Sequence, residues 1–311
     1  MHVTFRPITG PAELPLFLRL TYELDGEVPG DLERGNRRPG WLWIAERDGE
    51  VLARAGWWAR PGATAPQLMD FFDFADGHAA SGEALVRAAL DRLVPAGSAP
   101  PEYIRFVPPG WRQDDAAVRP RLAALEHLGA RLFVERLRLE WRPGTPIAPG
   151  EGPDEGPEEG RLRFRGFAGT DEALDLMTRA VAGTLDAHSR AGLERMSPRA
   201  VAEEHFHGEL ERYSSPRDWW RVATRPGGEP VGFVFPARND YGPIIAYIAV
   251  LPEHRGHGYV DAILAEGTRV LAAHDVPRIR ASTDAGNVPM ARAFARAGYV
   301  NYQNQLDMTW Q

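Results

Sequence analysis

The sequence predicts an α+β protein that contains two copies of one structural plan. Three kinds of segment recur in the same order, roughly 160–180 residues apart, which is typical of an internal repeat. The second copy also contains an aliphatic run, a glycine-bearing turn and a helical pattern in succession, at residues 244–264. At 311 residues, the chain is long enough to form two domains that each bury a core.

The repeated segments follow each other in chain order. The first is a Phe-Arg pair before a helical pattern of leucines, and the second is a strand, a turn carrying Gly-Glu, and another strand. The third is a helix that ends on a glycine C-cap and leads into terminal strands closing on a tryptophan. The two copies of these segments begin at residues 5 and 164, 41 and 219, and 122 and 291.

A segment rich in Pro, Gly and Glu separates the two copies. Residues 142–160 show no hydrophobic periodicity, which is typical of a linker. We therefore expect a first domain at residues 1–142, a linker at 143–160 and a second domain at 161–311.

Composition excludes several classes of site and partner. The net charge of −7 argues against a nucleic-acid partner, because proteins that bind a phosphate backbone concentrate positive charge. The absence of cysteine excludes disulfides, thiolate metal sites and a cysteine nucleophile, and we expect no metal. No signal sequence or transmembrane run is visible, so we expect a cytoplasmic protein without a membrane partner, as a monomer or homodimer.

Residues 244–264 predict a buried strand, a tight turn and the start of a helix. Six of the seven residues from Ile244 to Val250 are aliphatic, with Tyr247 the exception, as expected for a central strand. Pro252 ends the strand, and apolar residues from Val260 onward follow helical spacing. The turn between them, Arg255-Gly256-His257-Gly258, lacks side-chain bulk. Its consecutive amides, at the positive end of a helix, can therefore bind a phosphate or pyrophosphate.

Val250-x-Pro252-x-x-Arg255-Gly256-x-Gly258, after a strand and before a helix, resembles the acetyl-CoA-binding signature of the GNAT acetyltransferase superfamily, with Val260 at its last small position. The resemblance implies two tandem GNAT-like domains, each with a mixed, mostly antiparallel central sheet flanked by helices. It also implies an acyltransferase (EC 2.3.1.-) that moves an acetyl group from acetyl-CoA to a primary amine of an unknown small-molecule acceptor. We expect direct transfer in a ternary complex, because no cysteine can carry an acyl intermediate.

The same resemblance implies which residues bind acetyl-CoA. In the family, the central strand splays from its neighbour near a bulge and its exposed backbone receives the pantetheine arm. The pyrophosphate would lie on the amides of the turn. Asn287 matches an asparagine that hydrogen-bonds the pantetheine arm, although it is also a good helix N-cap. The implied residues are Ile248, Ala249, Val250, Arg255, Gly256, His257, Gly258, Tyr259, Val260, Asn287 and Phe294.

The catalytic groups follow less directly from the pattern. Many relatives carry a proton-donating tyrosine seven residues after the asparagine, but here the position is Phe294, which has no proton to give. The nearest candidates for the general base are Asp240, which also fits a turn, and Tyr247, which also fits a core position. Asp186 and Glu204 are candidates for contacting a cationic acceptor.

The first copy lacks the glycine-bearing turn. Counting back from the shared helix places Gly77 opposite Arg255 and Ala80 opposite Gly258. Asp73 and Asp76 also bring negative charge to the place where a pyrophosphate would lie. We therefore expect the first copy not to bind CoA and to act as a partner domain, either structurally or as one wall of the acceptor pocket.

Two other functions remain open from the sequence. Phe294 and the degenerate first copy also fit a CoA-binding sensor or pseudoenzyme with weak or no catalysis. The same scaffold also suits a transferase of longer acyl groups or of aminoacyl groups, although the acidic net charge disfavours tRNA.

Overall fold

The computed structural model describes residues 2–147 and 162–310. The chain divides into two compact units: unit 1 takes in Met1–Glu135 and Asn304–Gln311, and unit 2 takes in Arg136–Gln303. Both units combine helices with a mixed sheet, so the predicted α+β class is confirmed. Among the helices described, none has the length and apolar character needed to cross a membrane.

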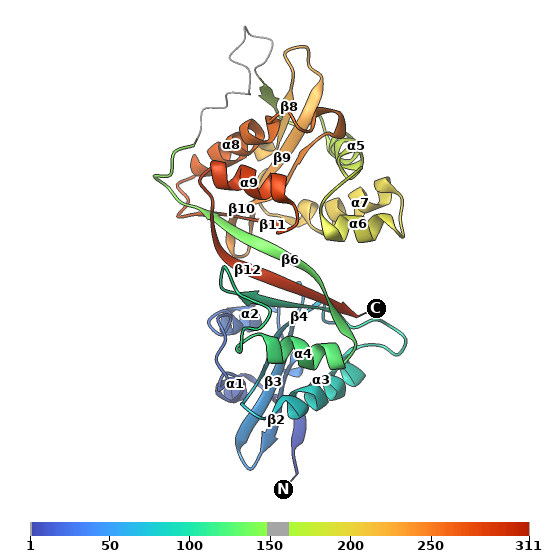
Figure 1. The fold of residues 1–311 in the computed structure, drawn as a ribbon, viewed down its shortest axis with the longest axis vertical. Helices are drawn as coiled ribbons and strands as arrows, with labels where there is room; N and C mark the ends of the chain where they lie inside the picture. The colour runs from blue at the N-terminus through green and yellow to red at the C-terminus, as the bar shows by residue number, and fades with distance from the viewer. Residues whose placement is uncertain (1, 148–161, 311) are drawn as a thin grey trace. The chain divides into compact units, whose positions relative to one another are not determined.

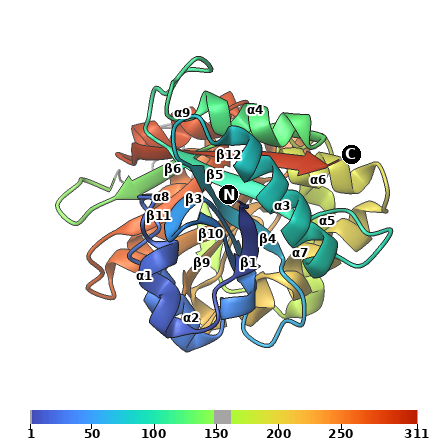
Figure 2. The same cartoon turned by 90° about the horizontal axis from the view of Figure 1, so that it is seen from below.

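The sheet of unit 1 has one parallel pair, β4 with β5, among antiparallel neighbours. Helices α1 (Leu14–Phe17) and α2 (Val28–Arg34) pack on one face, and α3 (Ala79–Leu93) and α4 (Arg119–His127) pack on the other (Figure 2). The strands, in sheet order, are β1 (Thr4–Pro7), β2 (Leu42–Arg47), β3 (Glu50–Trp58), β4 (Leu68–Phe74), β5 (Glu102–Val107) and β12 (Val300–Trp310).

The sheet of unit 2 repeats this design, with β10 and β11 as its parallel pair (Figure 1). Phe233 and Phe235 pack on one face under α5 and α7, while Ile245 packs on the other under α8 and α9. The strands, in sheet order, are β6 (Ala130–Trp141), β11 (Ile279–Asp284), β10 (Gly242–Val250), β9 (Pro230–Asn239), β8 (Arg221–Thr224) and β7 (Arg163–Arg165). The helices are α5 (Thr170–Ala180), α6 (Ala187–Leu193), α7 (Pro198–Gly208), α8 (Tyr259–Ala272) and α9 (Val288–Arg296).

The last strand of each copy pairs in the unit formed mainly by the other copy. β12 pairs with β5 from Asn304 to Met308, and β6 pairs with β11 from Arg136 to Trp141. The compact units therefore differ from the expected ranges 1–142 and 161–311. Each copy also ends in a single long strand where we expected more than one. Of the expected linker at 143–160, residues 148–160 lie outside the described part of the chain.

Gly232 on β9 permits the close approach of β10. A Cβ atom at this position would lie 2.4 Å from the carbonyl oxygen of Ala249 and 2.7 Å from Cδ1 of Ile263. Because a paired backbone oxygen cannot move aside, we predict that Gly232→Ala lowers the free energy of unfolding by about 1–3 kcal/mol. Thermal unfolding checks this, with Gly227→Ala as the matched control because a Cβ atom added at Gly227 would meet no atom within 4 Å. Equal melting temperatures for the two variants would contradict the close approach.

Candidate functional site

β10 and β11 separate directly after they meet. Their parallel pairing is confined to Ile244 and Arg280, although β10 continues to Val250 and β11 to Asp284. On its other edge, β10 remains paired with β9 as far as Val250, with a β-bulge between Ile245 and Tyr247. We call the unpaired stretch, Ile245–Val250 facing Ala281–Asp284, the β10–β11 splay. A bulge beside such a separation re-aims the main-chain groups that follow it.

Main-chain groups of Ile248 and Val250 face this splay. The N–H of Leu251 donates to the carbonyl of Val231 at 2.9 Å, and the carbonyl of Ala249 lies against Gly232, so both residues face β9. Successive strand residues alternate between the two edges, so Ile248 and Val250 turn their main-chain groups to the splay. All three of these strand residues were predicted to bind acetyl-CoA. The main-chain groups of Ala249, however, face β9 and not the splay.

The turn before α8 presents a run of unbonded amides. Gly256 and Gly258 have φ angles of 82° and 75°, in the left-handed region that favours glycine, and Gly258 is the N-cap of α8. Within the described part of the chain, the N–H groups from Gly256 to Val260, which include those of His257 and Tyr259, donate to no acceptor. Five consecutive donors at the positive end of a helix form an arrangement suited to an anion.

Arg255 has a different role from the one the sequence suggested. Its guanidinium donates to the carbonyls of Ala180 (2.7 Å), Ala182 (2.8 Å), Gly183 (3.1 Å) and Val250 (3.1 Å). The side chain therefore ties the turn to the end of α5 and to the end of β10. Since these bonds engage all three nitrogens of the guanidinium, the Arg255 side chain positions the turn and does not contact a ligand with this group.

Asn287 and Phe294, both predicted to contact acetyl-CoA, have different environments in the structure. Asn287 caps α9, its Oδ1 accepting from the N–H of Met290 at 3.4 Å, and its side-chain NH2 has no acceptor among the residues described. Phe294 is only 1% exposed and packs edge-on against Tyr299 at 5.1 Å between ring centroids. It is therefore a core residue, which corrects its placement with the ligand-contacting residues. The Tyr299 hydroxyl is paired with Thr268 at 2.8 Å.

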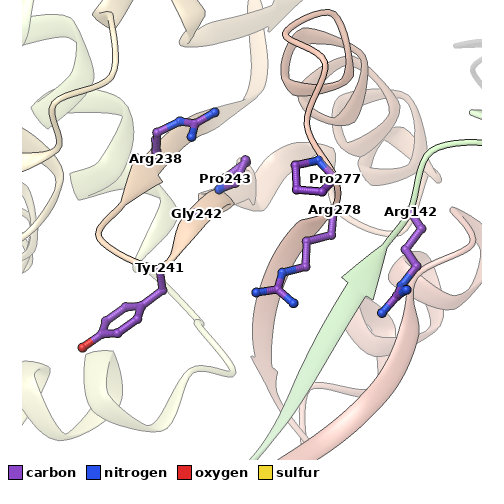
Figure 3. A pocket seen from close by; sticks show the side chains of 7 residues that line it. All are labelled: Arg142, Arg238, Tyr241, Gly242, Pro243, Pro277 and Arg278. Atoms are coloured by element: carbon purple, nitrogen blue, oxygen red, sulfur yellow. The ribbon is translucent and has the colours of Figure 1, made fainter. Parts of the chain in front are cut away.

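Asp240 does not lie at the splay. It is exposed in the turn between β9 and β10, six residues before the bulged Ala246, or roughly 20 Å along the strand. A pocket of about 310 Å³ lies at this same end of β10 (Figure 3). Its lining residues are Arg142, Arg238, Tyr241, Gly242, Pro243, Pro277 and Arg278.

Tyr247 lies on the face of the sheet that α5 and α7 cover. Its ring stacks on Phe233 at 5.6 Å and meets His205 edge-on at 4.9 Å. Burial, reinforced by the charge of Asp186, raises the pKa of the Tyr247 phenol. A phenol that stays protonated can donate a hydrogen bond but cannot act as a base at neutral pH. Tyr247 therefore does not suit the predicted role of general base.

Of the two predicted acceptor-binding residues, Asp186 is held in place by the fold. Its carboxylate caps α6, accepting from the N–H of Ser189 at 2.7 Å. Burial acts to raise the pKa of Asp186, but the Ser189 hydrogen bonds and Arg136 outweigh it and hold that pKa below its usual value. Glu204, in contrast, is exposed on α7.

Asp284 belongs to this group and was missed in the sequence. Its carboxylate is 3% exposed, and its Oδ2 accepts from the N–H of Ala187, the first residue of α6, at 2.7 Å. Burial, together with the charge of Asp186, raises the pKa of Asp284. The sequence feature that could have indicated Asp284 is its position at the end of a predicted strand, three residues before Asn287.

In unit 1, β4 separates from β5 in a corresponding way, but a side chain of β5 bridges the two strands. Pairing there is confined to Leu68–Glu102 and Met69–Tyr103. Arg105 then reaches across from β5, donating to the carbonyl of Phe72 at 3.3 Å and to Asp73 at 3.2 Å. The turn that follows β4 has four residues, 75–78, whereas the turn after β10 has eight, 251–258. The shared helix begins after His78, so His78, not Ala80, corresponds to Gly258.

Asp73 is a buried ion-pair centre and does not face a ligand. Besides Arg105, it binds Nε of Arg54 at 3.1 Å and Nε of Arg121 at 2.9 Å. Because Asp73→Asn would leave these cations without their shared carboxylate, we predict a loss of about 3–5 kcal/mol in the free energy of unfolding. Thermal unfolding measures the loss, with exposed Asp76→Asn as the control. A melting temperature unchanged by Asp73→Asn would show that the network does not stabilise unit 1.

Comparison with known proteins agrees with this geometry. The model of the acetyltransferase (GNAT) family matches residues 189–299, and no curated protein matches the sequence. The fold is similar to a GCN5-related N-acetyltransferase from Sphaerobacter thermophilus, with 18% identity and a TM-score of 0.60 over 99% of this chain and 95% of that one. A tandem GNAT protein from the clavulanic acid biosynthesis pathway, solved without AcCoA, is 15% identical, with a TM-score of 0.55 over 99% and 98% of the two chains.

A third similar structure is a GCN5-related glucosamine N-acetyltransferase region in a fungal multi-domain GH3 beta-N-acetylglucosaminidase. It is 14% identical, with a TM-score of 0.58 over 99% of this chain and 38% of that one. At these identities the structural similarities establish the fold, while the family model identifies residues 189–299 as a GNAT domain. Residues 189–299 thus match the GNAT family, and the chain as a whole is similar in fold to these structures, one of which is a tandem GNAT protein.

Proposed function

We propose that unit 2 binds acetyl-CoA along the β10–β11 splay and transfers its acetyl group to a primary amine. The match of residues 189–299 to the acetyltransferase (GNAT) family model supports an acyltransferase. The proposal of acetyl-CoA binding rests mainly on the run of five unbonded amides from Gly256 to Val260. These amides follow β10, whose main chain has separated from that of β11.

These groups suit the parts of acetyl-CoA in turn. The amides from Gly256 to Val260 would donate to the pyrophosphate, with the α8 dipole adding to their attraction. Main-chain groups of Ile248 and Val250 would bind the amide-bearing pantetheine arm as a further strand binds a sheet edge. The side-chain NH2 of Asn287 is a further donor on the same side of the unit, since α9 follows β11 directly.

Acetyl-CoA would supply an acetyl group already activated as a thioester. A main-chain N–H next to the bulge is suited to hydrogen-bond the carbonyl oxygen as negative charge develops on it. Because the chain has no cysteine, no thiol acyl-enzyme can form, and direct attack by the acceptor amine is the simplest route. The chain's contribution is then to orient the two substrates and to manage protons.

A thermal-shift measurement with acetyl-CoA tests the proposal. Saturation at about 100 times the dissociation constant adds about 2.7 kcal/mol of stability, so the melting temperature of the wild type should rise clearly. Gly258→Glu should abolish the rise, because it puts a side chain and a negative charge where the pyrophosphate would lie. Gly228→Glu is the matched control: Gly228 also has a positive φ, 89°, but lies in the turn between β8 and β9. A wild type that acetyl-CoA fails to stabilise would contradict the proposal.

One observation favours a second candidate, a CoA-binding sensor without catalysis. At the usual position of the proton donor, the chain has Phe294, buried in the core. A sensor would be stabilised by acetyl-CoA yet release no free thiol with any primary amine. A transferase would release CoA thiol with at least one member of an amine panel.

A further inference from the structure

We infer that the Asp284 carboxylate receives the proton from the acceptor's ammonium group, and that the acceptor therefore approaches unit 2 on the face covered by α6. This inference rests on the proposed function and assigns its missing base.

The register of the two strands places Asp284 at the splay. β10 and β11 run parallel, and Ile244 pairs with Arg280. Four residues further along β11 is Asp284, and the same distance along β10, where the bulge at Ala246 adds one residue, ends between Ile248 and Ala249. Asp284 is therefore level with the main-chain groups that would hold the reactive end of acetyl-CoA. Asp240, at the opposite end of β10, has no such placement.

The two oxygens of the Asp284 carboxylate have different partners. Oδ2 accepts the Ala187 N–H at 2.7 Å, which fixes the orientation of the group. Oδ1 is buried and accepts no hydrogen bond within the described residues. Arg136 Nε lies 3.1 Å away, but its N–H is not directed at this oxygen, so the contact is an ion pair without a hydrogen bond. An oriented carboxylate with one oxygen that accepts no hydrogen bond can take up a proton there.

The charged groups around Asp284 set its protonation. Arg136 comes from β6, directly opposite Asp284 in the antiparallel pair, and therefore lies on the same face. Asp186 and His188 come from the start of α6. Burial and the Asp186 charge raise the pKa of Asp284 against the effects of the Ala187 hydrogen bond, Arg136 and His188. A carboxylate whose pKa is raised is a better proton acceptor than an ordinary one.

The other candidates on this face are less suited to the task. Tyr247 remains protonated, and Asp186 already serves as the α6 cap with a lowered pKa. His205 lies against the ring of Tyr247 and within 3.7 Å of Glu209. Asp284 alone among these combines an oxygen that accepts no hydrogen bond with a position level with Ile248.

The proton balance is simple. Asp284 takes one proton from the ammonium ion, directly or across one water, and leaves a neutral amine. The amine nitrogen attacks the thioester carbonyl, forming the C–N bond. The C–S bond then breaks, and the second proton on nitrogen passes to the departing sulfur, which gives the amide and free CoA thiol. Asp284 finally releases its proton to solvent.

The test compares Asp284→Asn with the wild type on two acceptors. An alkylamine is an ammonium ion at neutral pH and needs a base, whereas methoxyamine is already neutral. We expect Asp284→Asn to lower kcat/KM for the alkylamine about 10²–10³-fold and to lower it less than about tenfold for methoxyamine. The rise in melting temperature with acetyl-CoA should persist, because the amides of the turn are untouched.

A second measurement is independent of activity. In protein labelled with ¹³C at the aspartate carboxyl carbons, one resonance should titrate above the usual value of about 3.9 and vanish in Asp284→Asn. Asp275→Asn is the matched control, because Asp275 is exposed with a φ of 51°, a conformation that asparagine tolerates. It should match the wild type in every assay.

The outcomes separate this inference from the function beneath it. Equal losses with both acceptors, or no loss with either, would overturn the assignment of Asp284 while leaving acetyl transfer in place. A wild type that is stabilised by acetyl-CoA but transfers to no amine would overturn the transferase function and this assignment with it.

Discussion

The early separation of β10 from β11 is the constraint on which the rest of unit 2 depends. A strand that leaves its neighbour exposes N–H and C=O groups, and these must find other partners or water. The bulge at Ala246 and the close contact at Gly232 keep β10 paired with β9, so the exposed groups lie on one edge only. That edge leads into the turn at Gly256–Gly258, where the free amides continue the line of donors. The same stretch of chain therefore presents first a strand edge and then a helix end whose amides have no acceptor.

The two units show two solutions to one structural problem. In unit 1, the separated strands are bridged by Arg105, whose guanidinium binds the Phe72 carbonyl and Asp73. In unit 2, the residue at the corresponding register is Thr283, which is too short to reach across in this way. The turn after the strand is also shorter in unit 1, and Asp73 is neutralised internally by arginines. In unit 1, a side chain of the unit itself therefore binds a main-chain carbonyl at the separation.

Much of the fold followed from the sequence because it is encoded locally. The repeated segments predicted the α+β class and the order of elements, and the Arg-Gly-His-Gly turn predicted the start of a helix, which in the structure begins at Tyr259. The exchange of β6 and β12 could not be predicted this way, because a strand's pattern shows which residues are buried but not which strand it pairs with. Arg255 matched a motif position, but three of its four side-chain acceptors lie more than seventy residues away in the sequence. Asp284 was missed for the same reason, since its role depends on α6 and β6.

The connection between α5 and α6 joins the two halves of the candidate site. Arg255 holds its first residues through the carbonyls of Ala182 and Gly183, and Asp284 holds its end through the N–H of Ala187. One anchor comes from the turn that precedes α8, and the other comes from the strand across the splay. The segment between them carries Asp186, the residue whose charge acts on both Tyr247 and Asp284. Both ends of this connection are therefore anchored by hydrogen bonds to other elements of unit 2.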